Sequence, residues 1–403
     1  MKCFKEKIYI IRLVFIFWIP CLLGFSCNET RKETLGENPA SMAPPRYHVK
    51  IDVEKDSMVQ SSSVFQRSWF LELESKEGAL IGNIDKLLFD DDLIFVVDKE
   101  RAQVVFIYDN EGRLIKAIDE KGKGPREFIE IRDVALDMHQ KRICLLDLAS
   151  RKINFYDYTG EYLESTPIPF LFSSFAYIDS STIAFDLRTA YNRNEQIGNY
   201  YLVTAEMDGT IHNRAFNYEN DEKGFTYWSA RHLLSSGENV LFQPRFSNTI
   251  YDVREGEVLP FFFLDFLGKG FPDNVKIVTD DQFRGLFQKY SFLNGEYVDL
   301  KESACFAIDT PKGNLYVLYS KNTDKTISLR PFLIQDLLSG FFRPPFERYN
   351  DSTIVTFAPA YEALRSKNAY FSYSEEEGIG DDMFPDLTEN DNPVLFFYNI
   401  NKF

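Results

Sequence analysis

A group of four short apolar runs, repeated after about fifty residues, restricts the fold of this chain more than any other feature. In both copies, β-branched and aromatic runs alternate with acidic or glycine-containing turns. The runs are residues 84–89, 93–98, 104–109 and 114–118, then 134–137, 143–147, 153–157 and 162–165. Asp98 and Asp147 stand 49 positions apart at equivalent places, and Gly112 and Gly160 stand 48 apart. Four antiparallel strands per unit at this period predict the blades of a β-propeller rather than a helical solenoid.

Looser units with the same strand and turn chemistry follow these two. They are residues 174–216, 232–266 and 304–334, and a last unit with strands at 353–357 and 394–399. A ring leaves no sheet edge exposed only if its ends join, so we expect the early run 69–73 to pair into the last blade. The fold class is therefore all-β, a single six-bladed β-propeller over residues 65–403.

Two short helices are expected inside this ring. Residues 279–282 resemble a capping box, and apolar side chains follow at positions 283, 286, 287 and 290. That spacing predicts a short helix between the fourth and fifth blades. A second helix is expected at 358–367, within the last blade.

The first 26 residues read as an export signal. Lys2, Lys5, Lys7 and Arg12 precede 13 residues without a charge, too few to span a bilayer as a helix. The run ends in Leu-Leu-Gly-Phe-Ser-Cys, which resembles a lipobox, although Phe25 stands where small residues are commoner. In bacterial lipoproteins the cysteine matching Cys27 is diacylated. Residues 27–64 would then form a polar tether. A plain secretory peptide or an uncleaved anchor is the alternative.

Charge and cysteine content limit the partners and cofactors. A net charge of −16 argues against a nucleic-acid partner, which would need a basic face. Beyond Cys27, the expected mature chain holds only Cys144 and Cys305, both inside apolar runs, and we expect buried free thiols rather than a bridge. The sequence contains no Cys-x-x-Cys pair and no Cys/His cluster, so we do not expect a zinc site.

Four segments resemble a known family. They are residues 104–118 (VVFIYDNEGRLIKAI), 122–128 (GKGPREF), 155–160 (FYDYTG) and 390–395 (NDNPVL). The first three are similar to NHL-type repeats. Together the four resemble the six-bladed β-propeller lipoproteins of Gram-negative outer membranes, with Arg126 at a position where those proteins have glycine. The resemblance implies an outer-membrane lipoprotein, periplasmic or surface-exposed, and leaves the activity open.

Few residues point to catalysis or to a metal. The four histidines are scattered, and no nucleophile motif is present, so we name no catalytic residue. Asp98 and Asp147 are weak candidate ligands for calcium, the one cofactor considered. The alternative is that each accepts backbone hydrogen bonds in a turn. Residues 122–125 lack the ending of a phosphate loop, so a rigid turn between blades is expected there.

Exposed aromatic and basic side chains are the candidate binding residues. Phe225, Tyr227 and Trp228 lie in a polar loop, Tyr191 lies in the long loop 188–199, and Arg126 lies in the basic loop after the first blade. We expect a binding or scaffold module for a peptide, protein or glycan, anchored to the membrane through its lipid. A calcium-dependent hydrolase or lyase with its site in the central channel is the alternative, and a structural subunit of an envelope complex is a third.

Overall fold

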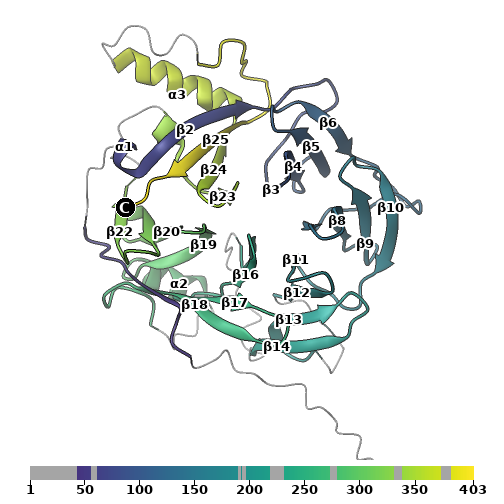
Figure 1. The fold of residues 1–403 in the computed structure, drawn as a ribbon, viewed down its shortest axis with the longest axis horizontal. Helices are drawn as coiled ribbons and strands as arrows, with labels where there is room; N and C mark the ends of the chain where they lie inside the picture. Colours follow the sequence, from purple (N-terminus) through teal and green to yellow (C-terminus); the bar gives the residue numbers. More distant parts are fainter. Residues whose placement is uncertain are drawn as a thin grey trace, which may run out of the picture. The chain divides into compact units, whose positions relative to one another are not determined.

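Six blades of four antiparallel strands form a ring in the computed structural model, and one further strand pairs in parallel with the edge of one blade (Figure 1). The structure describes residues 43–55, 61–188, 192, 197–217, 231–272, 279–330, 338–373 and 383–403. From the channel outward, blades 1 to 3 are β3 (Lys86–Asp90), β4 (Leu93–Asp98), β5 (Val104–Asp109), β6 (Leu114–Ile118); β7 (Asp133–Asp137), β8 (Arg142–Asp147), β9 (Lys152–Asp157), β10 (Tyr162–Pro167); β11 (Ser174–Tyr177), β12 (Thr182–Asp186), β13 (Tyr200–Glu206), β14 (Ile211–Asn217).

Blades 4 and 5 follow the same order, and the sixth takes its outermost strand from the start of the chain. Their strands are β15 (Leu233–Ser236), β16 (Asn239–Phe242), β17 (Thr249–Val253), β18 (Val258–Asp265); β19 (Phe292–Asp299), β20 (Ser303–Thr310), β21 (Gly313–Ser320), β22 (Thr326–Leu329); β23 (Glu347–Arg348), β24 (Thr353–Ala358), β25 (Val394–Ile400), β2 (Phe65–Glu72). The predicted six-bladed propeller is confirmed.

Burial between neighbouring blades explains the continuous apolar runs of the sequence. Successive side chains of a strand point to opposite faces. In β4, Phe95 and Val97 pack into a core shared with blade 2, whereas Ile94 and Val96 pack into a core shared with blade 6. A strand with both faces buried therefore has no polar alternation.

The ring closes as the sequence predicts. β2 pairs with β25 in antiparallel register, with Phe70 opposite Phe396. Trp69 stacks on Phe397 with ring centroids 5.0 Å apart. The first strand of the ring and the last strand of the chain thus share one sheet.

A strand inside the range assigned to the tether belongs to the propeller. β1 (Tyr47–Lys50) lies along the outer edge of blade 4, parallel to β18, with Tyr47 opposite Phe262. Val49, Ile51 and Val53 are buried in the core that blades 4 and 5 share. A polar tether can therefore extend over no more than the residues before β1.

The fifth blade begins earlier than the sequence indicates, because β19 is its innermost strand. Both predicted helices are present: α2 (Asp280–Phe287), capped by Thr279, and α3 (Ala360–Tyr373). Among the described residues, the other helical segments are α1 (Ser61–Val64) and the 3-10 turn η3 (Leu338–Phe341). Within the described part of the chain, no helix has the length and apolarity to cross a membrane.

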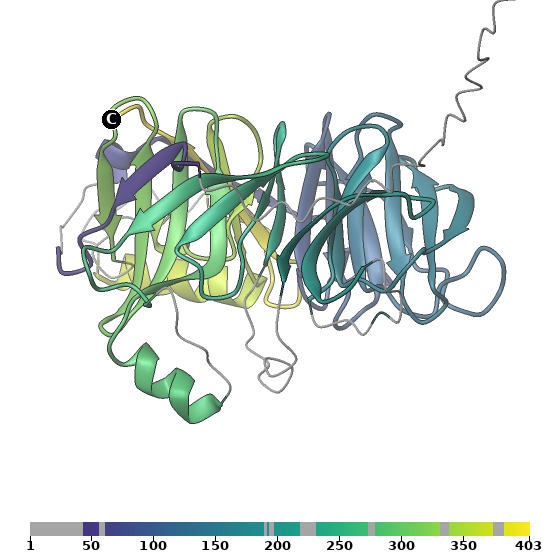
Figure 2. The same ribbon diagram turned by 90° about the horizontal axis from the view of Figure 1, so that it is seen from below.

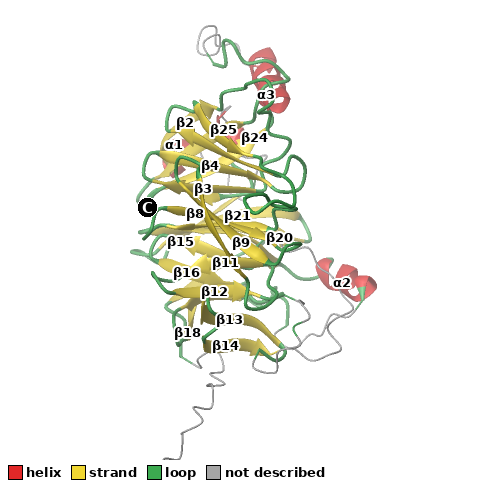
Figure 3. Cartoon of the chain, turned by 90° about the vertical axis from the view of Figure 1, so that its right-hand side faces the viewer, coloured by secondary structure: helices red, strands yellow, loops and turns green. Residues whose placement is uncertain are grey.

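The two faces of the ring differ sharply in the length of their connections. Because strands alternate in direction, the first turn of every blade and the third turn of blades 1 to 5 lie on one face, which we call the short-turn face. These turns have 2 to 5 residues. The other connections lie on the opposite, long-loop face, among them residues 119–132, 266–291 with α2, and 359–393 with α3. Figures 2 and 3 show both helices on the same side of the ring.

Candidate functional site

The long-loop face is held together by buried aspartates at the ends of equivalent strands. Asp98 Oδ2 accepts the N–H groups of Gly82 at 2.7 Å and Asn83 at 2.9 Å. Its Oδ1 accepts those of Arg101 at 3.0 Å and Ala102 at 2.8 Å. One carboxylate therefore ties the connection before β3 to the connection after β4.

Asp147 repeats this arrangement one blade later. It accepts the N–H groups of Ile129 at 2.9 Å and Ser150 at 3.1 Å. At the corresponding end of β12, Asp186 accepts the N–H of Arg188 at 2.9 Å. These are the contacts that the turn-capping alternative predicts. Among the residues that the structure describes, no three His, Cys, Asp or Glu side chains are grouped as a metal site.

The basic loop after the first blade is closed by its own glutamate. Glu127 Oε2 accepts the N–H of Gly124 at 2.7 Å, and Gly122 donates its N–H to the Phe128 carbonyl at 2.9 Å. A Cβ atom at Gly122 would lie 1.9 Å from the Glu127 carboxylate. This carboxylate occupies the place of an anion, as expected for a rigid turn rather than a phosphate loop.

Of the sequence-predicted binding residues, the structure describes only Arg126. Arg126 is exposed, and its Cζ lies 5.9 Å from the ring centroid of Tyr162. The other candidates lie outside the described residues: Cys27, Tyr191, Phe225, Tyr227 and Trp228.

The thiols and histidines have structural surroundings. Cys144 and Cys305 are free and buried, as expected, and burial raises the pKa of Cys144 to about 12. His232 is buried with Nδ1 2.8 Å from the Gln243 carbonyl oxygen, and burial lowers its pKa. The surroundings of these two thiols and of His232 therefore indicate neither a nucleophile nor a metal ligand.

A buried ionic cluster beside the channel was not found from the sequence. The Arg231 guanidinium lies 2.8 Å from Glu296 Oε2 and 2.7 Å from Glu347 Oε2. It also donates to the Phe346 carbonyl. Burial alone would lower the Arg231 pKa, but the two carboxylates outweigh burial and raise it, so the guanidinium stays charged. These residues join blade 5, blade 6 and the segment before blade 4.

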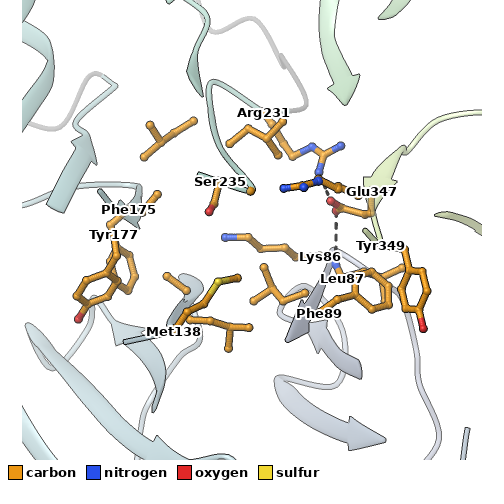
Figure 4. A pocket seen from close by; sticks show the side chains of 18 of the residues that line it. Lys86, Leu87, Phe89, Met138, Phe175, Tyr177, Arg231, Ser235, Glu347 and Tyr349 are labelled. Atoms are coloured by element: carbon orange, nitrogen blue, oxygen red, sulfur yellow. Dashed lines mark hydrogen bonds and ion pairs between the residues drawn. The ribbon is translucent and has the colours of Figure 1, made fainter. Parts of the chain in front are cut away.

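A cavity of about 250 Å³ lies at the centre of the ring (Figure 4). The innermost strands of five blades line it, those of all blades except blade 5. Lys86 enters it from β3 and bonds Asp133 Oδ1 at 3.0 Å and the Val134 carbonyl at 2.7 Å. Ser235 is exposed to this space from β15. In the sequence, Lys86 is a lysine at the start of an apolar strand and belongs to no catalytic motif.

The helical insertions of the long-loop face are anchored by packing. In α2, the Thr279 hydroxyl caps the helix by accepting the Gln282 N–H at 3.2 Å. Phe283 packs against Phe292, with ring centroids 6.0 Å apart. In α3, Glu362 pairs with Arg343 at 2.7 Å. Both insertions therefore have a fixed base on the ring.

Comparisons with known proteins place the chain in a family without an assigned function. A Bacteroides fragilis protein named "putative exported protein" has a similar structure, with a TM-score of 0.70, 20% identity, and coverage of 88% of this chain and 99% of that one. A member of the DUF4221 family from Bacteroides vulgatus has a TM-score of 0.47 at 8% identity, over 84% and 97% of the two chains. No curated protein matches significantly.

The match to a family model covers nearly the whole ring. It extends over residues 45–399 and begins before β1, in agreement with the place of that strand in blade 4. The chain therefore belongs to the family described as domain of unknown function DUF4934.

Proposed function

We propose that this protein is a lipid-anchored, extracytoplasmic binding module that engages a protein, peptide or glycan through its long-loop face. The observation that carries the proposal is the difference between the two faces. Turns of 2 to 5 residues are enough to close the ring on the short-turn face. The opposite face carries connections of up to 35 residues, which ring closure does not require.

The described parts of this face are built to hold their shape. The Asp98 and Asp147 carboxylates link neighbouring connections, and the base of α2 packs on aromatic side chains of the ring. A surface that is already ordered loses less conformational freedom on binding, so more of its contact energy appears as affinity. Ordered insertions confined to one face therefore favour recognition over a purely structural role.

The direction of β1 determines the side from which the chain enters the ring. β18 leaves the turn at 254–257 and leads into the connection 266–291, and β1 is parallel to it. The chain therefore enters β1 from the short-turn side. Nineteen residues separate Cys27 from Tyr47. The segment that leads into β1 therefore joins the ring on the side opposite the long-loop face. The name of the Bacteroides fragilis neighbour agrees with export.

The anchor is tested by intact mass and fractionation. We expect the wild-type protein in the membrane fraction, with a mature mass that begins at Cys27 and includes a diacylglyceryl group. Cys27→Ser should abolish this mass and release the protein from washed membranes. Wild-type protein that starts elsewhere or lacks a lipid would refute the anchor and leave the binding proposal standing.

The binding face is tested separately with the soluble chain from residue 28. Its binding to glycan and peptide arrays and to envelope extract should depend on the loop side chains Phe225, Tyr227 and Trp228. We expect their combined replacement by alanine to remove specific retention. Glu238→Ala with Glu257→Ala, two exposed changes in short turns, is the matched control and should leave retention intact. The reverse pattern would assign binding to the short-turn face.

A further inference from the structure

We propose that the central cavity binds a small organic anion, a monocarboxylate with an apolar or aromatic body. The innermost strands line this cavity, so a ligand there would not depend on a partner at the long connections. The wall charges, the wall shape and the volume of the cavity each restrict the class of ligand.

The charged wall of the cavity is mainly cationic. Lys86, Arg231 and Arg348 line it, against a single lining carboxylate, Glu347. The other acidic partners of these cations are not part of the lining. Asp133 holds Lys86 at 3.0 Å, Glu296 holds Arg231 at 2.8 Å, and Asp351 holds Arg348 at 2.5 Å. Counted with these partners, the surroundings of the cavity hold three cations and four carboxylates, so an anion is favoured by the N–H donors that face the cavity and not by an excess of positive charge.

Lys86 is the residue best placed to meet the anion. An ammonium group has three N–H donors, and Asp133 and the Val134 carbonyl take two of them. Figure 4 shows the amino group directed into the cavity, which Ser235 also lines. A carboxylate there would accept a charge-assisted hydrogen bond from Lys86, with the Ser235 hydroxyl as a second donor.

Aromatic side chains on two sides of the cavity could pack against the apolar body of the ligand. Phe89 and Tyr349 meet edge to face with centroids 5.3 Å apart, and Phe175 and Tyr177 lie 6.4 Å apart. Figure 4 shows the two pairs on opposite sides of the cavity, with Met138 between them. This combination of apolar walls with a few polar groups is typical of small-molecule sites.

The volume excludes a large ligand. About 250 Å³ is below the range of about 300–1,000 Å³ found for drug-sized ligands. An aryl or short alkyl carboxylate fits this space, whereas an oligosaccharide or a nucleotide does not.

Calorimetry with matched probes tests the proposal on the soluble chain from residue 28. The probes are benzoate, 3-phenylpropionate and hexanoate, with 3-phenylpropionamide and 3-phenylpropylamine as the neutral and cationic analogues. We expect at least one carboxylate to bind, the amide to bind at least tenfold more weakly than its acid, and the amine not to bind. Added salt should weaken carboxylate binding. Failure of all three carboxylates at millimolar concentration, or equal affinity for acid and amide, would overturn the proposal.

Two variants locate the binding in the cavity. Ser235→Trp adds an indole to an exposed position of the cavity wall and should remove binding while the melting temperature is kept. Lys86→Gln should reduce affinity at least tenfold, and Asp133→Asn in the same chain avoids a buried unpaired carboxylate if the single variant is unstable. Glu238→Ala, outside the lining, should bind as wild type does. Unchanged binding in Ser235→Trp would place the ligand elsewhere.

Discussion

Replacing Asp98 with alanine removes a buried carboxylate that accepts four backbone hydrogen bonds from two separate connections. Asp147, its equivalent one blade later, accepts two such bonds. Both side chains are fully buried. The two substitutions therefore delete the same group from the same strand position and differ in the number of N–H donors left without an acceptor.

The expected losses follow from that number. An N–H group left unpaired in a protein interior costs about 1–3 kcal/mol, and the lower value applies where water can enter a loop after the substitution. Asp98→Ala should then lower the free energy of unfolding by about 4 kcal/mol, and Asp147→Ala by about 2 kcal/mol. For a ring of about 340 residues, these losses correspond to about 6 °C and 3 °C in Tm.

Thermal unfolding followed by circular dichroism, at one scan rate, measures both shifts. Asp208→Ala is the control, because Asp208 accepts the Thr210 N–H in an exposed short turn and its loss should leave Tm unchanged. EDTA and added calcium should not change the Tm of the wild type. A smaller loss for Asp98→Ala than for Asp147→Ala would refute the reasoning. The reasoning would also be refuted if EDTA lowered the Tm of the wild type as much as Asp98→Ala does, because the carboxylate would then be a metal ligand.

Three further changes test other parts of the structure. Arg231→Met leaves two buried carboxylates without their cation and should cost about 3–5 kcal/mol. Burial already raises the Glu347 pKa in the wild type despite Arg231, and losing the guanidinium raises it further. A raised pKa in the folded state adds to the free energy of unfolding at low pH, and this contribution is lost as the pH rises. In urea titrations, the free energy of unfolding of Arg231→Met should therefore fall further below that of the wild type as the pH increases from acidic to neutral. Gly112→Ala should lower Tm more than Gly78→Ala, because both have positive φ but only the first Cβ meets a backbone oxygen, at 2.3 Å. A chain that begins at residue 65 lacks β1 and its buried side chains, and should lose about 5 kcal/mol of stability by denaturant titration.

The sequence predicted the ring because its signal is repeated. Blades 1 and 2 match the predicted runs to within about two residues at each end, since four similar strands recur with the same turns. The short helix at α2 was also predictable, because its capping residues and its apolar spacing are both local. Local patterns were sufficient wherever the structure depends on neighbours in the chain.

Three strands, β1, β19 and β23, were missed for physical reasons. β19 contains Asn294 and Gly295, which read as a turn, but the structure has a bulge there and Gly295 takes a φ of 93°. β23 has two residues, Glu347 and Arg348, and no apolar run. β1 did leave a signal, because apolar residues alternate strictly at positions 47, 49, 51 and 53. The polar composition of the preceding segment concealed it.

The central cavity and its charges could not be predicted from spacing. Arg231 lies 65 positions from Glu296 and 115 from Phe346, and ring closure alone brings them together. Charged residues on the innermost strands can be recognised as cavity-lining residues only once the position of the channel is known. Of the candidate residues chosen from loop composition, only Arg126 lies in the part of the chain that the structure describes.

Site-specific photocrosslinking in cells tests the central claim most directly. A photoreactive phenylalanine analogue at Phe287, partly exposed on α2, reports on the long-loop face, and the same analogue at Glu257 reports on the short-turn face. We predict a discrete adduct from position 287 and none from position 257. Adducts from position 257 alone, or equally from both positions, would contradict a binding module that acts through its long-loop face.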